Sequence, residues 1–154
     1  MLELITISEV NDDLAEMVAS FRVELRSYKG IVSRTNVDAG REEMEEYLVA
    51  GFPVFVAMVD GQYAGYVVCR VDSEVVWVES IFVKEEFRRH GVASALHRKA
   101  EDIAASYGDD TVYNYVHPNN HRMIEFLRKR GYTVLNLIEI RKPYKGERLT
   151  QAIT

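Results

Sequence analysis

The spacing of apolar residues changes repeatedly along this chain, and that change limits the folds it can form. Some short runs alternate apolar and polar residues, as a β-strand does, and longer stretches repeat at the 3.6-residue period of an amphipathic helix. The predicted order is strand, two helices, three strands, helix, strand, helix and strand. This order favours an α/β (α+β) domain built around one central sheet.

In the first part of the chain, "LELITI" is predicted to be a strand. A helix should follow with Ser8 as its N-cap and end near Gly30. Its expected apolar face consists of Leu14, Met17, Val18, Phe21 and Leu25. The stretch "REEMEEYLVAG", after Gly40, predicts a second helix.

The pair Asp60-Gly61 is a favoured tight-turn sequence, and it separates "PVFVAMV" from "YAGYVVCRV". These runs predict a β-hairpin, which "VVWVESIFV" extends by a further strand. Beyond it, the pattern predicts a helix over about 91–107, a strand at "TVYNYV" and a helix over about 119–130. A last strand is predicted at "YTVLNLIEIRK", and the residues from Pro143 onward are predicted to be a loose tail.

The predicted helix over 91–107 has an expected buried stripe of Val92, Leu96, Ala100 and Ile103. This stripe places His97 on the exposed side. No second histidine or cysteine lies four residues further on, so His97 is not expected to bind a metal.

Composition narrows the functional classes. The chain has 154 residues, 47% of them hydrophobic, which suits a single domain, and its net charge of -5 argues against a general nucleic-acid binder. There is no run of eighteen apolar residues and no basic, apolar leader at the N-terminus, so we expect a cytoplasmic protein without a membrane partner. Cys69 is the sole cysteine and lies in an apolar run, which favours a small buried side chain.

The entrance of the helix over 91–107 is unusual in its charge. Arg88 and Arg89 precede Gly91, although the start of a helix already carries partial positive charge. An anion reverses this cost, because free backbone amides and guanidinium groups both bind phosphate. The stretch therefore indicates a phosphate site, with a solvated basic turn as the alternative.

Two motifs in this part of the chain resemble the GNAT acetyltransferase superfamily. "Arg88-Arg89-His90-Gly91-Val92-Ala93" is similar to its R/Q-x-x-G-x-G/A signature, and "NHRMIEFLRKRGY" is similar to its second block. The resemblance implies one N-acetyltransferase domain over 1–154, with the cofactor core at about 75–132. It also implies a mixed, mostly antiparallel central sheet flanked by about four helices.

The resemblance further implies acetyl-CoA as the acyl donor, without a metal. The pyrophosphate would lie on the first amides of the helix over 91–107, and the pantetheine arm would run along the strand edge at "SIFV". Amides in that edge would polarise the thioester carbonyl. The cofactor-binding residues expected on this basis are Ile81, Phe82, Val83, Arg88, Arg89, His90, Gly91, Val92, Ala93, Ser94 and Asn120. Asn120 is also a candidate N-cap for the last helix.

Acetylation of an amine requires a base, because a free amine is mostly protonated at neutral pH. Strict alternation along "VVWVESIFV" places Glu79 on the same face as Trp77, Ile81 and Val83, so we expect its carboxylate to lie in a partly apolar setting that suits a general base. The alternative is a surface carboxylate. A bulge in this strand would change the facing.

The chain departs from the family at Leu127, where many members have a Tyr that protonates the departing thiolate. Tyr115 and Tyr113 are candidate substitutes, with aromatic packing as their alternative role. An enzyme that acetylates a primary amine in a ternary complex and a non-catalytic acyl-CoA-binding module both fit these observations. The acceptor, a small molecule or a peptide, is not specified by the sequence. The acidic run around Glu43 is compatible with either a solvated helix face or a border for a cationic amine, and a homodimer is among the possible assemblies.

Overall fold

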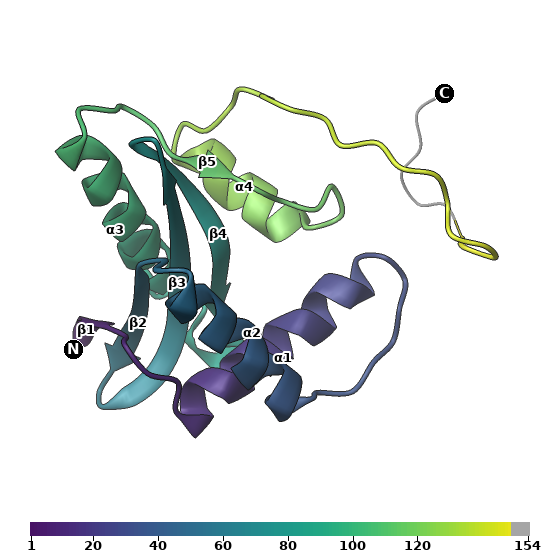
Figure 1. Ribbon diagram of the computed structural model, residues 1–154, viewed down its shortest axis with the longest axis horizontal. Coiled ribbons are helices and arrows are strands. Elements are labelled where there is room, and N and C mark those ends of the chain that lie inside the picture. The colour runs from purple at the N-terminus through teal and green to yellow at the C-terminus, as the bar shows by residue number, and fades with distance from the viewer. Residues whose placement is uncertain (149–154) are drawn as a thin grey trace.

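The computed structural model describes residues 1–148, which form a single domain around a five-stranded sheet of order β1-β2-β3-β4-β5 (Figure 1). Neighbouring strands from β1 to β4 are antiparallel, and β5 is parallel to β4. The predicted mixed, mostly antiparallel sheet is therefore confirmed. The strands are β1 (Leu2–Thr6), β2 (Val54–Val59), β3 (Gln62–Asp72), β4 (Val75–Val83) and β5 (Tyr113–Asn114).

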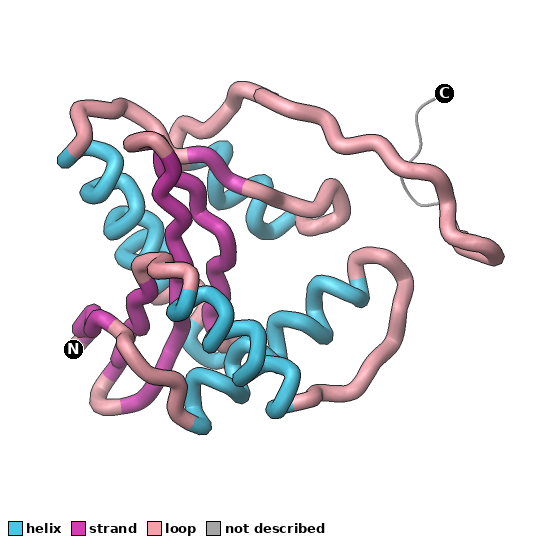
Figure 2. Tube along the Cα trace, in the orientation of Figure 1, coloured by secondary structure: helices cyan, strands magenta, loops and turns pink. Residues whose placement is uncertain are grey.

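The helices cover both faces of the sheet (Figure 2). One apolar cluster joins α1 and α2 to the sheet through residues such as Leu14, Met44 and Tyr66. A second cluster, which includes Leu96 and Ala100, joins α3 to the opposite face. The helices are α1 (Asp12–Ser27), α2 (Val37–Val49), α3 (Val92–Ser106) and α4 (His121–Lys129), with a short 3-10 turn at Glu85–Phe87.

Two helices begin at residues other than those predicted. The side chain of Asn11, and not that of Ser8, caps α1 by accepting a hydrogen bond from the Leu14 amide at 3.0 Å. Asn36 caps α2 in the same way, so α2 begins at Val37, before Gly40. An asparagine carbonyl reaches the amide three residues on, and this local bond decides where each helix starts.

The predicted hairpin turn is confirmed at Asp60 and Gly61, whose φ angles are 48° and 79°. A second tight turn follows β3 at Ser73 and Glu74, where both φ angles are positive, although neither residue is a glycine. It joins β3 to β4, so the meander from β2 to β4 has the predicted order.

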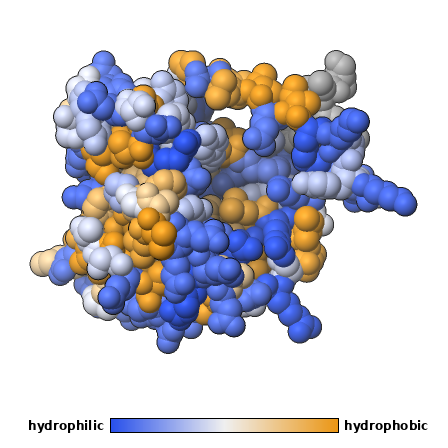
Figure 3. All heavy atoms as spheres, viewed as in Figure 1, coloured by the Kyte–Doolittle hydropathy of each residue, from blue (hydrophilic) through white to orange (hydrophobic). Residues whose placement is uncertain are grey.

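The C-terminal part of the prediction is only partly correct. The strand predicted at "TVYNYV" is reduced to Tyr113–Asn114. The strand predicted at "YTVLNLIEIRK" is absent, because residues 133–142 form an extended, exposed stretch that pairs with no strand among the described residues (Figure 1). Figure 3 shows hydrophobic residues along this upper side of the molecule. In the predicted tail, Glu147 holds Arg141 at 2.6 Å, and residues 149–154 lie outside the described residues.

Candidate active site

Strand β4 has one edge that is largely unpaired. It pairs with β5 only at Trp77 and Val78, and the stretch from Ile81 to Val83 has a strand neighbour only on the β3 side. The side chains of Ile81, Phe82 and Val83 are buried in the two apolar clusters. What this edge presents to a ligand is therefore main chain, as recognition by backbone hydrogen bonds requires.

A β-bulge lies in β4 where this edge opens. Val68 and Cys69 of β3 are adjacent, but they pair with Ser80 and Val78, so Glu79 is the extra residue. Ile81 and Val83 pack in the α3 cluster, whereas Phe82 packs in the α1–α2 cluster and Ser80 bonds Tyr66 there at 3.1 Å. The predicted shared face of Glu79 with Ile81 and Val83 is therefore wrong, because the bulge resets the alternation after Glu79.

Arg70, on β3, joins the two residues that sequence reasoning selected for catalysis. Its Nε lies 3.4 Å from Glu79 Oε2, and its Nη2 donates to the Tyr115 hydroxyl at 3.0 Å. The guanidinium also lies 4.3 Å from the centre of the Trp77 ring. The three polar side chains therefore form one cluster, in which the cation of Arg70 lies beside the carboxylate of Glu79.

Sequence reasoning missed Arg70. The available signal was a cation within the apolar run "YVVCRV", opposite Trp77 in the hairpin register. Tyr113 contacts Trp77 through its ring, with 5.5 Å between centroids, as the alternative packing role predicted. Tyr115 is exposed, so its hydroxyl is accessible to a ligand.

The negative charge of Glu79 also affects Tyr47, a residue of α2. Burial, followed by the charges of Glu43 and Glu79, raises the pKa of the Tyr47 hydroxyl, which donates to Glu43 at 3.2 Å. Glu43 in turn accepts a hydrogen bond from Arg22 at 2.6 Å. The predicted acidic run therefore contributes at least one carboxylate on the same side of the sheet as Glu79.

The start of α3 differs from the other helix starts. Gly91 takes the left-handed conformation, with φ of 79°, and α3 has no side-chain cap and no acidic residue in its first turn. Arg89, two residues earlier, also has a positive φ of 66°. Arg89, His90 and Gly91 are exposed, Ala93 and Ser94 are half-buried, and Val92 anchors the turn in the core. The first amides of α3 are thus open to an anion.

Arg88 points back toward the sheet. Its Nε donates to the Val83 carbonyl at 2.9 Å, and its Nη2 donates to Glu24 of α1 at 2.7 Å. Arg122 of α4 also donates to Glu24, at 3.1 Å. Arg88 therefore ties the end of β4 to α1, while Arg89 is the neighbouring arginine whose side chain is exposed.

Asn120 and Leu127 have structural roles in α4. The Asn120 side chain caps the helix by accepting from the Met123 amide at 3.2 Å, which confirms the N-cap interpretation. Leu127 is buried in the interior of the protein.

The prediction that His97 is exposed is wrong. Its side chain is fully buried, because Phe126 of α4 and Tyr132, which follows α4, cover a second face of α3. Its Nε2 lies 2.9 Å from Asn114 Oδ1, and the Tyr132 ring packs edge-on at 5.0 Å. Burial lowers the pKa of this imidazole, which favours its neutral form. Cys69 is also buried, as predicted, and burial raises the pKa of its thiol to about 12.

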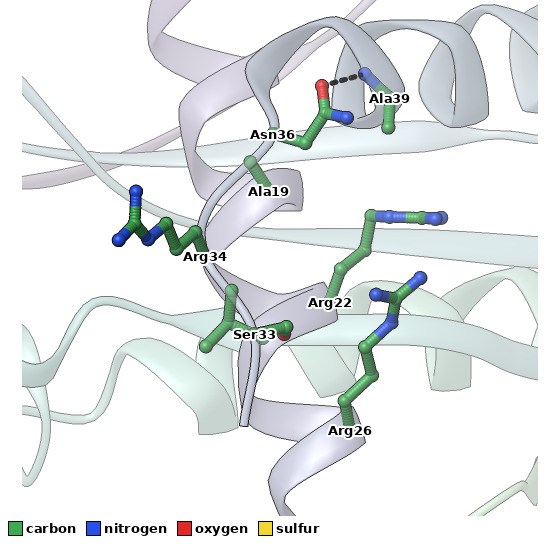
Figure 4. Close-up of a pocket in the computed structure, with 8 residues that line it drawn as sticks. Ala19, Arg22, Arg26, Ser33, Arg34, Asn36 and Ala39 are labelled. Carbon is green, nitrogen blue, oxygen red and sulfur yellow. Dashed lines mark hydrogen bonds between the residues drawn. The ribbon is translucent and has the colours of Figure 1, made fainter. Parts of the chain in front are cut away.

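A separate cavity of about 170 Å³ lies between α1 and the loop before α2 (Figure 4). Arg22 and Arg26 point to one side of the loop, and Arg34 points to the other. The guanidinium groups therefore do not converge on one point.

Residues 1–148 hold neither a group of metal ligands nor a membrane-spanning helix. No three His, Cys, Asp or Glu side chains in this range are grouped as metal ligands would be. No helix in it is long and apolar enough to cross a bilayer. The cytoplasmic location stays a prediction.

The sequence is similar to those of known acetyltransferases. The profile of the acetyltransferase (GNAT) family matches residues 19–132. An uncharacterised N-acetyltransferase of Methanocaldococcus jannaschii is 33% identical over 85 residues, which is 51% of this chain and 38% of that protein, so the match spans less than half of the relative.

Solved structures share the fold at low identity. The aminoglycoside N-acetyltransferase AAC(6')-Iy in complex with CoA is 24% identical, with a TM-score of 0.67 over 92% of this chain and 95% of that one. The PaiA N-acetyltransferase of Thermoplasma acidophilum, in complex with coenzyme A, is 17% identical, with a TM-score of 0.67 over 84% and 88%. The profile match over most of the sequence shows that this chain belongs to the GNAT family of acetyltransferases.

Proposed function

We propose that this protein transfers the acetyl group of acetyl-CoA to a primary amine by direct attack in a ternary complex. The observation that carries the proposal is the bulge that sets Glu79 where β4 leaves β5 and its edge becomes free. A base at this point lies beside the edge on which the thioester would lie. Membership of the acetyltransferase family supports acetyl transfer. The primary amine as acceptor and the direct attack in a ternary complex are our proposal.

In the proposed reaction, the amine nitrogen attacks the thioester carbonyl carbon, so a C–N bond forms and the C–S bond breaks. The carboxylate of Glu79 accepts the proton that the amine loses, directly or through water. The sulfur leaves as a thiolate and takes a proton from the Tyr115 hydroxyl or from solvent. Leu127 cannot supply this proton, so Tyr115, exposed and bonded to Arg70, is the residue that we propose as the acid.

The donor site that we propose combines two sets of main-chain groups. The amides from Arg89 to Ser94, in the turn that leads into α3 and in its first residues, would hold the pyrophosphate, and the edge from Ile81 to Val83 would hold the pantetheine arm. When bound, acetyl-CoA supplies the activated thioester. The absent side-chain cap of α3 and the unpaired edge of β4 support this assignment. Asn120, at the start of α4, is the remaining cofactor contact that we propose.

Arg70 is a positioning residue in this scheme. Its Nε lies beside the Glu79 carboxylate and its Nη2 donates to the Tyr115 hydroxyl, while its guanidinium stacks on Trp77. In our proposal, Arg70 thus positions the base, Glu79, relative to the acid, Tyr115.

A cationic amine suits the acceptor side. Glu43 and Glu79 both raise the pKa of Tyr47 by their negative charge, so two carboxylates face the same region between α2 and β4. The structural neighbours include acetyltransferases named for aminoglycosides, which carry several amines. We therefore propose an acceptor with more than one amino group.

The test is release of CoA thiol from acetyl-CoA in the presence of an amine panel that includes polyamines, aminoglycosides and peptides. We expect release with at least one amine. CoA binding by calorimetry without release for any amine would favour the alternative, a non-catalytic acyl-CoA-binding module. Absence of CoA binding would contradict both.

A further inference from the structure

His97 is a buried polar side chain that the proposed reaction does not use. It lies on α3, is fully buried, and has the rings of Phe126 and Tyr132 packed edge-on against it, at 5.8 and 5.0 Å between centroids. An apolar side chain would fill this space without losing contact with water, whereas a polar ring is costly to bury unless it makes hydrogen bonds. The polar contacts of His97 therefore indicate its role.

One nitrogen of the His97 ring reaches β5. Nε2 lies 2.9 Å from Asn114 Oδ1, and the side-chain nitrogen of Asn114 donates to the Val112 carbonyl at 3.3 Å. Because Oδ1 is the acceptor, Nε2 is the donor, and Nδ1 carries the lone pair of the neutral ring. Nδ1 makes no hydrogen bond within residues 1–148, and Glu101 Oε2 lies 4.0 Å from it. The hydrogen bond of the buried ring is thus spent on Asn114.

Strand β5 has few main-chain contacts of its own. It consists of Tyr113 and Asn114, and it pairs with β4 at Trp77 and Val78. It is the last strand in the sheet order, so its other edge pairs with no strand among the described residues. Parallel pairing over so short a length provides few hydrogen bonds. The side-chain bond from α3 is therefore an important part of what holds Asn114 in place.

The place of Asn114 sets the place of Tyr115, the next residue. Asn114 faces α3, and alternation along an extended chain turns Tyr113 and Tyr115 to the other face. On that face the Tyr113 ring lies 5.5 Å from the Trp77 ring, and the Tyr115 hydroxyl accepts from Arg70 at 3.0 Å. A shift of Asn114 would therefore move the Tyr115 hydroxyl relative to Arg70.

Helix α3 also carries the turn to which we assign the pyrophosphate. His97 lies within about two turns of Gly91, where the helix begins. The amides of that first turn and the ring that holds Asn114 therefore belong to one rigid element. A donor held at the start of α3 and a tyrosine held through Asn114 share the same frame of reference.

We infer that His97 is a positioning residue for the acid, which acts through Asn114 to hold Tyr115 in a fixed place relative to α3 and the donor bound there. The inference rests on the proposed function, in which Tyr115 protonates the departing thiolate. His97 exchanges no proton in this scheme and acts by its hydrogen bond alone.

The first experiment compares the kinetics of His97→Leu and His97→Gln with the amine that the panel identifies. Leucine cannot donate, and we expect kcat to fall about tenfold, because a small misplacement of a reacting group lowers the rate steeply. Glutamine presents an N–H near the place of Nε2, so kcat should return to within about threefold of the parent. The Kd for CoA should change by less than about twofold in both variants.

Two further variants complete this set. His121→Leu, the matched control, replaces an exposed histidine on α4 and should keep the parent's kcat. Asn114→Ala, at the other end of the hydrogen bond, should lose as much kcat as His97→Leu, and it serves if that variant does not fold. Parent-like kcat in both His97→Leu and Asn114→Ala would overturn the inference, as would a glutamine variant no faster than the leucine variant.

The same substitution in a Tyr115→Phe background separates positioning from a general structural role. If His97 acts through Tyr115, adding His97→Leu to Tyr115→Phe causes no further fall in kcat, because two residues that act as one unit have effects that do not add. A further fall of the same size would show that His97 acts elsewhere. An unchanged kcat in Tyr115→Phe alone would contradict the acid assignment and, with it, this inference.

The second experiment needs no catalysis. Trp77 is the sole tryptophan of the chain, and it contacts the Tyr113 ring of β5. Quenching of its fluorescence by acrylamide therefore reports whether β5 keeps its place against β4. We expect quenching to be stronger in folded His97→Leu than in the parent, in His97→Gln and in His121→Leu.

This measurement distinguishes failure of the inference from failure of the proposed function. Equal quenching in all four proteins would overturn the inference, whether or not the protein acetylates an amine. Stronger quenching in His97→Leu, in a protein that acetylates no amine, would support the hold of His97 on β5 and contradict the proposed function alone.

Discussion

The two halves of the sheet differ in how they satisfy their main-chain polar groups. In the first half, β2 pairs along its length with β1 and β3, and the side chains of Asn11 and Asn36 cap the N-termini of α1 and α2. In the second half, β4 pairs with β5 at two positions, and α3 starts at Gly91 with no side-chain cap. Local hydrogen bonds thus pair the main-chain groups of the first half, which we call closed. They leave main-chain groups of the second half free, and we call that half open.

The difference is informative because free amides and carbonyls are costly to leave unused away from water. Here they lie at the edge of β4 and at the start of α3, which follow one another in the chain. Asn120 shows that this half can cap a helix, since it caps α4. The missing cap on α3 is therefore a specific feature of that helix, and we infer that a ligand takes its place.

The largest effect is expected from Glu79→Gln, which keeps the shape of the side chain and removes its basicity. We expect kcat at pH 7 to fall by roughly a hundredfold or more, because loss of a general base typically costs 10² to 10⁴ in rate. The affinity for acetyl-CoA should change by less than about twofold. Higher pH should partly restore the rate, because the amine then loses its proton to solvent.

The matched control is Glu3→Gln, an exposed carboxylate on β1 in the closed half. Its kcat should equal that of the parent. If Glu79→Gln keeps the parent's kcat and the same acidic limb in its pH–rate profile, Glu79 is a surface carboxylate, and the base lies elsewhere.

The next effect concerns the start of α3. Gly91→Val should raise the Kd for CoA at least tenfold, about 1.4 kcal/mol, because a β-branched residue does not tolerate a φ of 79° and would displace the first amides. Gly108→Val is the control, since Gly108 has a φ of 81° and equally open surroundings beyond the other end of α3. If calorimetry gives Gly91→Val and Gly108→Val the same Kd for CoA, the proposed phosphate site does not lie at this turn.

The sequence was sufficient where structure depends on neighbours in the chain. The turn at Asp60-Gly61 and the extent of α3 follow from local preferences, and both were predicted. The bulge at Glu79 was not, because an extra residue in β4 is defined only by its pairing with β3. His97 was misplaced for a similar reason, since the 3.6-residue period shows one buried face and cannot show that α4 covers another.

The strand predicted at residues 132–142 shows a third limit. Its composition is that of a strand, but strand formation requires a partner edge, and the edge is a property of the assembled sheet. Arg70 was missed for the same reason, because it contacts Glu79 on the neighbouring strand β4 and Tyr115 just after β5, and these contacts depend on the assembled sheet.

A smaller effect is expected at Arg89. Because its side chain is exposed beside the first turn of α3, it should attract the phosphates mainly by charge. Arg89→Gln should weaken CoA binding roughly threefold at low salt and much less at high salt. Arg98→Gln, an exposed control further along α3, should leave binding unchanged. Dephospho-CoA should bind more weakly if Arg89 reaches the ribose phosphate. Binding of CoA that does not depend on salt would contradict a charge role.

The smallest effect, on stability, concerns His97, whose side chain is buried between α3 and α4. Burial is the main reason that its pKa is lowered from about 6.5, and the charge of Arg130 acts in the same direction, whereas Asn114 and Glu101 raise it. A lowered pKa means that the unfolded chain binds the proton more readily. The contribution to stability is therefore complete above about pH 6.5 and is lost as the pH falls below that value toward the folded-state pKa.

Thermal unfolding between about pH 5 and 8, where histidine is the side chain that titrates, measures this loss. We expect Tm to fall toward acidic pH in the parent, and the fall to be smaller in His97→Leu. His121→Leu, an exposed histidine on α4, should keep the parent's slope. Any slope left in His97→Leu is expected from His117, whose pKa is also lowered, first by burial and then by Lys29. An unchanged slope in His97→Leu would mean that the imidazole binds its proton equally in the folded and the unfolded states over this range, so that its burial contributes nothing to the pH dependence.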